Sequence, residues 1–238
     1  MRTCFILAGG FGTRIRHILG DIPKPLAPVN GRPFLFWLSK NLYKNGFRKI
    51  IFLAHFEPEK IIRFADSLDF PELSTEVVVE RQPMGTAGSI VSALSELSNI
   101  EDEFLIVNGD SLVITNLSDL FLEMSASNKF SLLGISMENC SRYGALKLEE
   151  NGKLLSFREK TGSMSGTINS GVYFAKKKFF ENKGPFTQPY SLEYDFIPRL
   201  LAAGEWVNVI SKDNVPFIDI GTESSLAEAD DFIKKYVI

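Results

Sequence analysis

A cluster of glycines follows the first apolar segment of the chain. Residues 3–8 form an apolar run of strand length. Directly after this run come Gly9, Gly10, Gly12, Thr13 and Arg14. Glycines let the backbone turn sharply and bring its N–H groups close to an anion. No Gly-Lys-Ser/Thr sequence follows, and Ile15 replaces the third glycine of a dinucleotide fingerprint. The segment therefore predicts either a phosphate-binding turn of another kind or an ordinary glycine-rich turn.

Two cations near this turn could bind phosphate. Lys24 lies between Pro23 and Pro25, and the two prolines restrict the backbone around it. A lysine held in this way offers a compact charge to a phosphate, and Arg14 adds a planar fork that suits a polyphosphate. The alternatives are a solvated lysine in a turn and an arginine on a helix surface.

Two aspartates lie at the ends of apolar segments. Asp110 follows the apolar run 104–108, and Asp219 lies within the apolar run 215–220. Mg²⁺ is typically bound through one or two carboxylates, together with water and substrate phosphates. The pair therefore predicts a magnesium site, although either aspartate alone could simply form a turn.

The elements that must position these residues alternate in type over the first half of the chain. Continuously apolar strands alternating with helices indicate a parallel sheet covered on both faces. The strands are predicted at residues 3–8, 49–54, 76–80 and 104–108, and the helices at 34–45, 58–68 and 88–97.

The pattern changes after about residue 128. Short strands are predicted at residues 130–137, 143–148, 154–157 and 171–175. They are separated by turns and indicate a smaller, partly antiparallel lobe. The chain is predicted to close with a helix at 192–203, capped by Ser191, a strand at 215–220 and a helix at 224–236. We expect one domain over residues 1–238.

Composition excludes several classes of protein. Lys and Arg number 26 against 29 for Asp and Glu, which gives a net charge of −3 and argues against a nucleic-acid partner. Two cysteines without paired spacing argue against a disulfide framework or a zinc site. No apolar run suits a signal peptide or a membrane span. We expect a cytoplasmic protein with no membrane partner.

A series of motifs resembles the sugar-1-phosphate nucleotidyltransferases. They occur in order at residues 7–14, 23–26, 80–88, 108–110, 157–160, 169–173 and 218–222. Within that family, Arg142-Tyr143-Gly144 and the segment 217–222 most resemble the D-glycero-D-manno-heptose 1-phosphate guanylyltransferases. Thr161 and Ser170 depart from the heptose pattern on the sugar side.

The resemblance implies a fold and a reaction. The fold would be a Rossmann-like α/β/α sandwich with a mainly parallel sheet and a smaller mixed-sheet sugar-binding lobe, without a C-terminal β-helix. Residues 1–128 would mainly bind nucleotide, and residues 129–238 would mainly bind sugar and close the fold. The reaction would join an NTP, with GTP expected, to a sugar 1-phosphate, with the heptose expected, and would use Mg²⁺. The alternatives are a mannose-1-phosphate guanylyltransferase, a uridylyl- or cytidylyltransferase, and a non-catalytic nucleotide-sugar-binding regulator. The resemblance does not decide whether the protein forms a homo-oligomer.

The resemblance also implies roles for individual residues. Catalysis is expected from Arg14, Lys24 and Asp110, and metal binding from Asp110 and Asp219. The nucleotide-binding residues are expected to be Leu7, Gly9, Gly10, Gly12, Thr13, Glu80, Gly85 and Thr86. The sugar-binding residues are expected to be Gly144, Glu159, Lys160 and Asn169. Glu80 is expected to read guanine, because a carboxylate can accept hydrogen bonds from both donors on that base's edge; the alternative is a solvated glutamate at a strand end.

Overall fold

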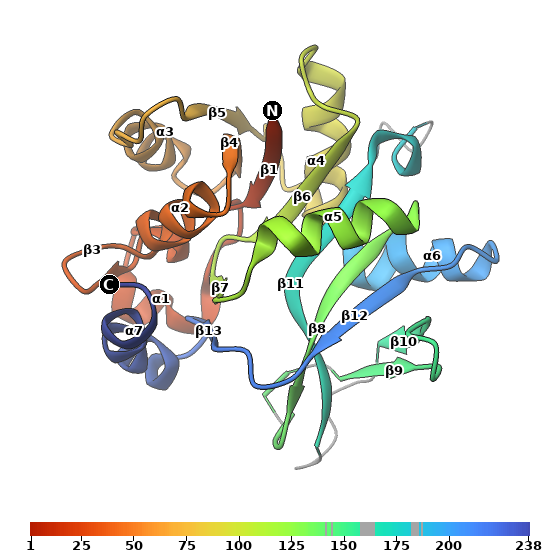
Figure 1. Cartoon of the computed structure of the whole chain (residues 1–238). Coiled ribbons are helices and arrows are strands. Elements are labelled where there is room, and N and C mark those ends of the chain that lie inside the picture. Colours follow the sequence, from red (N-terminus) through yellow and green to blue (C-terminus); the bar gives the residue numbers. More distant parts are fainter. Residues whose placement is uncertain (141, 144, 158–164, 182–185, 187) are drawn as a thin grey trace.

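A seven-stranded sheet forms the centre of the molecule (Figure 1). The computed structural model describes residues 1–140, 142–143, 145–157, 165–181, 186 and 188–238. The strand order is β12-β8-β11-β6-β1-β4-β5. In chain order the strands are β1 (Arg2–Leu7), β4 (Phe47–Ala54), β5 (Ser74–Val79), β6 (Glu103–Asn108), β8 (Ser131–Met137), β11 (Gly166–Lys176) and β12 (Asn208–Lys212). β11 is antiparallel to both of its neighbours, and every other pairing in this sheet is parallel. The predicted, mainly parallel sheet is confirmed.

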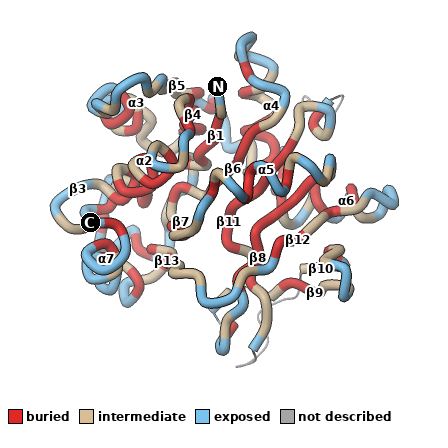
Figure 2. Tube along the Cα trace, in the orientation of Figure 1, coloured by how far each residue is buried: buried red, intermediate tan, exposed pale blue. Residues whose placement is uncertain are grey.

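Helices cover both faces of the sheet. Successive side chains of each strand point to opposite faces, so both faces carry apolar side chains that helices must bury. In β1, Cys4 and Ile6 pack into one hydrophobic cluster and Phe5 packs into the other. The first cluster lies under α2 (Phe34–Lys44), α3 (Pro58–Asp66), α5 (Leu117–Ser127) and α7 (Glu223–Tyr236). The second lies under α4 (Gly85–Glu96), the π-helix η4 (Leu192–Phe196) and α6 (Ile197–Ala202). The buried strands between the two layers are visible in Figure 2, and the predicted α/β/α sandwich is confirmed.

Short elements complete the fold around the strand ends. Three two-stranded sheets pair β2 (Pro28–Val29) with β3 (Arg32–Pro33), β7 (Ser111–Val113) with β13 (Phe217–Asp219), and β9 (Leu146–Leu148) with β10 (Leu154–Phe157). The short helices are η1 (Thr13–Ile15), α1 (Arg16–Leu19), η2 (Lys24–Leu26) and η3 (Lys177–Phe179). None of the helices in the described part of the chain is long and apolar enough to cross a membrane.

The strands after residue 128 are arranged differently from the predicted smaller lobe. The strands predicted at 130–137 and 171–175 join the central sheet as β8 and β11, and only β9 and β10 form a separate small sheet among them. β11 begins earlier than predicted. It pairs with β8 from Gly166, and it pairs with β6 only from Val172 onward. Strand pairing of this kind is decided by contacts between distant segments, which local periodicity does not contain.

The helix predicted at 192–203 is divided into two elements. Its first turn is a π-helix, and α6 follows it. Ser191 caps the π-helix as predicted, because its hydroxyl accepts hydrogen bonds from the N–H groups of Glu193 and Tyr194. This cap places the side chain of Glu193 beside the site described next.

Candidate active site

A cavity of about 430 Å³ opens where the central parallel strands end. Its lining comes from the segments that follow β1, β5 and β6, together with the start of α4. Open α/β sheets bind ligands at this edge, and the volume suits a small molecule. The predicted nucleotide-binding residues all line it: Leu7, Gly9, Gly10, Gly12, Thr13, Glu80, Gly85 and Thr86. The predicted catalytic residues Arg14, Lys24 and Asp110 line it as well.

The glycines after β1 pass close to the charged side chains of the cavity. Gly12 has a φ of +60°, and a Cβ there would lie 3.1 Å from Cβ of Lys24. A Cβ on Gly9 would lie 3.1 Å from Oε1 of Glu80. Larger residues would therefore push the loop away from both side chains, which is the close backbone approach that the sequence predicts.

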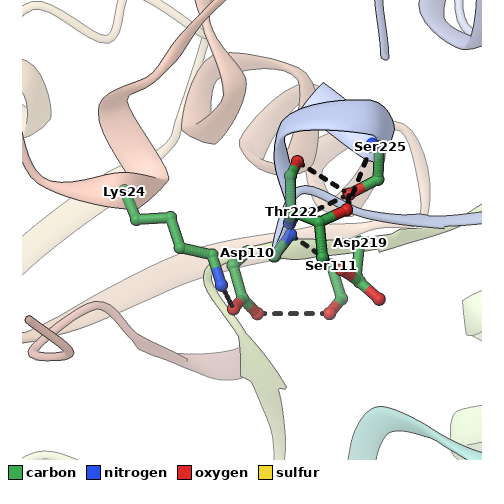
Figure 3. Close-up of polar contacts among 7 residues, drawn as sticks. Lys24, Asp110, Ser111, Asp219, Thr222 and Ser225 are labelled. Carbon is green, nitrogen blue, oxygen red and sulfur yellow. Dashed lines mark hydrogen bonds and ion pairs between the residues drawn. The ribbon is translucent and has the colours of Figure 1, made fainter. Parts of the chain in front are cut away.

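Lys24 is held against Asp110 rather than extended into solvent. Pro23 precedes the short helix η2, which starts at Lys24. The lysine side chain is only 9% exposed, and its Nζ forms an ion pair with Oδ2 of Asp110 (Figure 3). A buried cation needs such a partner. The solvated lysine, the alternative interpretation of this motif, is excluded, and a fixed charge faces the cavity.

The two predicted metal ligands are brought together by a pair of short strands. β7 pairs with β13 so that Ser111 lies opposite Asp219, and the N–H of Ile220 donates to the carbonyl of Asp110 at 2.9 Å. Oδ1 of Asp110 accepts from the Ser111 hydroxyl at 3.2 Å, and Oδ1 of Asp219 accepts from the N–H of Gly221 at 2.7 Å (Figure 3).

This donor set fits Mg²⁺. Two carboxylates are the protein ligands that this ion typically uses, and water and phosphate oxygens complete its shell. The described residues contain no group of three or more His, Cys, Asp or Glu side chains able to hold a metal. Magnesium binding by Asp110 and Asp219 stays a prediction.

Tyr143 and Arg142 support the segment that carries Asp219. Burial is the main cause that raises the pKa of Tyr143 to about 12, and the negative charge of the nearby Asp219 is the second. Nη2 of Arg142 donates to the Thr222 hydroxyl at 3.1 Å. Arg142 and Tyr143 of the motif that indicates the heptose enzymes therefore lie beside the predicted metal ligand and the segment after it, which spacing alone does not reveal.

Glu80 is a buried, partnered carboxylate at the end of β5. Its residue is 9% exposed, so the solvated glutamate is excluded. Oε1 accepts from the Ser89 hydroxyl at 2.6 Å, and Oε2 accepts from the N–H of Met84 at 3.0 Å. These bonds join the turn after β5 to α4. Each carboxylate oxygen keeps a further acceptor position, so reading of guanine stays a prediction.

The sugar side of the predicted site is described only in part. Gly144, Glu159 and Lys160 lie outside the described residues. Asn169 is half-buried in β11. Its Nδ2 donates to the Tyr173 hydroxyl at 2.6 Å, and its Oδ1 accepts from the N–H of Gly171 at 3.0 Å. The described cavity lining includes Asn108 but not Asn169.

Sequence reasoning missed an acidic side chain in the cavity wall. Glu193 lines the cavity, whereas the sequence identifies it only as an acidic residue in the first turn of a helix. Its position depends on contacts with Thr86 and Tyr173, from α4 and β11. Asn108 is a second missed lining residue. A Cβ on Gly171 would lie 2.5 Å from its Nδ2, which explains the glycine in Asn169-Ser170-Gly171.

Relatives match this chain along nearly its whole length. The D-glycero-alpha-D-manno-heptose 1-phosphate guanylyltransferase of Aneurinibacillus thermoaerophilus is 30% identical over 233 residues, which are 98% of this chain and 98% of that protein. The protein of the same name from Campylobacter jejuni is 34% identical over 177 residues, which are 74% of this chain and 77% of that protein.

The fold is also that of a solved structure. HddC from Yersinia pseudotuberculosis superposes with a TM-score of 0.85 at 29% identity, over 97% of this chain and 99% of that one. A second structure of HddC, complexed with GMP-PN, matches equally well. Residues 3–236 match the family described as nucleotidyl transferase. The resemblance seen in the motifs is thus confirmed, and the chain belongs to the nucleotidyl transferase family.

Proposed function

We propose that this enzyme transfers a guanylyl group from GTP to a sugar 1-phosphate, with D-glycero-D-manno-heptose 1-phosphate as the sugar substrate. The observation that carries the proposal is one cavity lined by the glycine turn, Lys24 and Asp110 at the ends of parallel strands. The relatives named as heptose 1-phosphate guanylyltransferases support the choice of substrates.

In the proposed reaction, an oxygen of the sugar phosphate attacks the α-phosphorus of the NTP. A new P–O bond forms to that oxygen, the bond between the α-phosphorus and the oxygen bridging to the β-phosphate breaks, and pyrophosphate leaves. The nucleophile is already an anion, so no histidine, cysteine or serine base is needed. Catalysis then consists of positioning and neutralisation of charge.

The residues that line the cavity, together with Asp219 next to it, would share this work. The backbone N–H groups after β1 would hold the triphosphate, with Arg14 at its β/γ end. Lys24 would neutralise charge near the α-phosphate, where its ion pair with Asp110 and its burial fix its position. Asp110 and Asp219 would hold Mg²⁺. When bound, this ion supplies neutralisation of phosphate charge.

Base choice is assigned to Glu80. Guanine offers two adjacent donors, the ring N1–H and the exocyclic amine, whereas uracil and thymine offer one donor between two carbonyls. The hydrogen bonds from Met84 and Ser89 fix the carboxylate of Glu80 in the cavity wall. The structure of HddC complexed with GMP-PN supports a nucleotide as a ligand of this fold.

A matrix of the four NTPs against several sugar 1-phosphates tests the proposal. Pyrophosphate release would be measured at saturating Mg²⁺, with the Asp110→Asn protein as the control for contaminating activity. We expect the largest kcat/KM with GTP and the heptose 1-phosphate. A different preferred pair would assign another substrate, such as mannose 1-phosphate or UTP. Release with no pair would contradict the enzyme function and favour a nucleotide-sugar-binding regulator.

A further inference from the structure

Tyr173 is a completely buried phenol that the proposed reaction does not use. It lies in β11 with 0% of its surface exposed, in the hydrophobic cluster beneath α4 and η4. Its hydroxyl has two partners: Nδ2 of Asn169 donates to it at 2.6 Å, and it donates to Oε1 of Glu193 at 2.5 Å. Burial and the charge of Glu193 raise the pKa of Tyr173 well above its usual value, so the hydroxyl keeps its proton near neutral pH.

The carboxylate of Glu193 is held from three elements. Tyr173 of β11 donates to Oε1. Oε2 accepts from the hydroxyl of Thr86, at the start of α4, at 3.3 Å, and from that of Ser191, the cap of η4, at 3.0 Å. Thr86 also accepts from the N–H of Leu192 at 2.7 Å. Glu193 therefore joins the α4 side of the cavity to the β11 side.

The direction of these hydrogen bonds fixes the amide of Asn169. An ionised carboxylate can only accept, so the Tyr173 hydroxyl must donate to Glu193. The phenol oxygen is then the acceptor for Asn169, whose nitrogen must face it. The N–H of Gly171 requires the same orientation independently, because it donates to Oδ1 of Asn169 at 3.0 Å. Among the described residues, one N–H and one acceptor position of this amide have no partner, and they remain available to other groups.

The strand order separates the β11 members of this network, Tyr173 and Asn169, from the predicted base site. Glu80 follows β5, at one end of the sheet, whereas β11 lies beyond β6 on the other side of β1. Gly171 of β11 approaches Asn108, two residues before Asp110. The β11 side of the network therefore borders the part of the cavity where the second substrate must lie if the nucleotide occupies the glycine turn.

We propose that Tyr173 is a positioning residue that holds the Glu193 carboxylate in the cavity wall and orients the Asn169 amide, so that the sugar 1-phosphate is bound more tightly. This inference rests on the proposed function, because that function places a sugar 1-phosphate here. The inference adds to the proposed site a residue that does not itself line the cavity. Tyr173 would act through its contacts with Asn169 and with the lining residue Glu193.

Tyr173→Phe removes only the hydroxyl and keeps the ring that fills the core. One hydrogen bond is worth a net of about 0.5–1.5 kcal/mol, so we expect KM for the sugar 1-phosphate to rise roughly 2- to 13-fold. KM for GTP should change less than about 2-fold. Tyr43→Phe, which removes a tyrosine hydroxyl from α2 outside the cavity lining, should leave both values unchanged.

Two Glu193 variants test the same arrangement from the other end. Gln at position 193 can still accept the proton of Tyr173, whereas Ala cannot. Glu193→Gln should therefore recover part of the sugar 1-phosphate affinity that Glu193→Ala loses. Equal losses in these two variants, an equal rise of both KM values in Tyr173→Phe, or no rise in either, with the fold intact by circular dichroism, would each overturn the inference.

A measurement without substrate separates this inference from the proposed function. The side-chain ¹⁵N–¹H signals of Asn169, assigned by their loss in Asn169→Ala, should shift in Tyr173→Phe and stay in place in Tyr43→Phe. If the wild type turns over no sugar 1-phosphate, the proposed function and the sugar part of the inference both fail. The Asn169 signals then still decide the positioning part, and signals that do not shift would contradict it.

Discussion

Lys24, Glu80 and Glu193 in the cavity lining are each held by a side-chain partner from another element. Lys24 is paired with Asp110, Glu80 accepts from Ser89, and Glu193 accepts from Tyr173. Charged groups that are fixed before the substrate arrives need little reorganisation during the reaction, and this is how a site lowers the barrier of a phosphoryl transfer. The predictions at this scale remove one such group each.

Replacement of Lys24 by Met should lower kcat by roughly 10²- to 10³-fold, the usual effect of removing one preorganised charge partner. KM for GTP should change little, because the charge acts mainly as pyrophosphate departs. Steady-state kinetics measures both quantities, and Lys40→Met, on α2, is the matched control. An increase in KM alone would move Lys24 from the reacting phosphate to the edge of the binding site.

The variants Asp110→Asn and Asp219→Asn should each abolish turnover while the protein stays folded. Loss of either charge would weaken the predicted magnesium site and leave phosphate charge unneutralised. Turnover at saturating Mg²⁺, Mn²⁺ binding followed by electron paramagnetic resonance, and thermal unfolding test this together. Asp231→Asn, on the exposed face of α7, is the control. Activity near the wild-type level in either variant would remove that aspartate from the metal site.

The preference for GTP over UTP should largely disappear in Glu80→Gln. A mismatched, desolvated carboxylate costs about 1–3 kcal/mol, which corresponds to roughly ten- to hundredfold discrimination. The ratio of kcat/KM for GTP and UTP gives the answer, and thermal unfolding reports whether the bonds to Ser89 and Met84 survive. Unchanged selectivity would show that backbone groups near Gly9 and Gly85 read the base.

At the scale of elements, the cavity depends on how the start of α4 is held. The carbonyl of Tyr190 accepts from the N–H groups of Ala87 and Gly88 at 2.9 and 3.0 Å, and the N–H of Tyr190 donates to the carbonyl of Met84 at 2.7 Å. These bonds satisfy N–H groups that the first turn of a helix leaves free. They also bring the segment after residue 188 against α4, and thereby bring Glu193 to the cavity.

Gly85→Ala should destabilise the protein by more than the conformational cost of a non-glycine residue at positive φ. A Cβ at Gly85 would lie 2.6 Å from the backbone nitrogen of Tyr190. Gly204 has a similar φ, +80°, with nothing within 4 Å, so Gly204→Ala measures the conformational cost alone, about 1–2 kcal/mol. Urea unfolding and binding of a non-hydrolysable GTP analogue should both show a larger loss in Gly85→Ala. Equal losses in the two variants would contradict the close contact.

At the scale of the whole molecule, the antiparallel strand β11 joins two groups of parallel strands. β6, β1, β4 and β5 lie on one side of it, and β8 and β12 lie on the other. Lys176 of β11 lies opposite Glu103 of β6, and their side chains form an ion pair at 2.6 Å. The pKa of Glu103 is lowered, mainly by the hydrogen bond from Lys176 and then by the hydrogen bond from Ser125.

This lowered pKa predicts a pH-dependent contribution to stability. A carboxyl whose pKa is lower in the folded state stabilises the fold above its unfolded pKa, and this stabilisation is lost as the pH falls through the folded pKa. Glu103→Gln should therefore cost about 0.5–1 kcal/mol at pH 7 and less in acid. The free energy of unfolding, measured with urea at pH 7 and again at an acidic pH, tests this. Glu123→Gln, which breaks an exposed ion pair with Lys212, is the control. A cost that does not depend on pH would contradict it.

The sequence by itself determined the alternating strands and helices of the first half and the positions of most chemical groups. Apolar runs, caps and glycines are local signals, so β1, α2, β4, α3, β5, α4 and β6 could be predicted within a few residues. The glycine turn, Lys24 and Asp110 follow from the same signals, because each lies directly after a strand or between prolines.

Only the tertiary structure decided how distant segments pair. That β8 and β11 extend the main sheet, that β7 and β13 bring Asp110 to Asp219, and that Glu193 reaches the cavity through Tyr173 depend on contacts between residues 20 to more than 100 positions apart. Local periodicity carries no information about such contacts, since one strand pattern is compatible with several neighbours. The direction of each hydrogen bond in the network likewise depends on which groups tertiary packing brings together, because each polar group that packing buries must then find a partner.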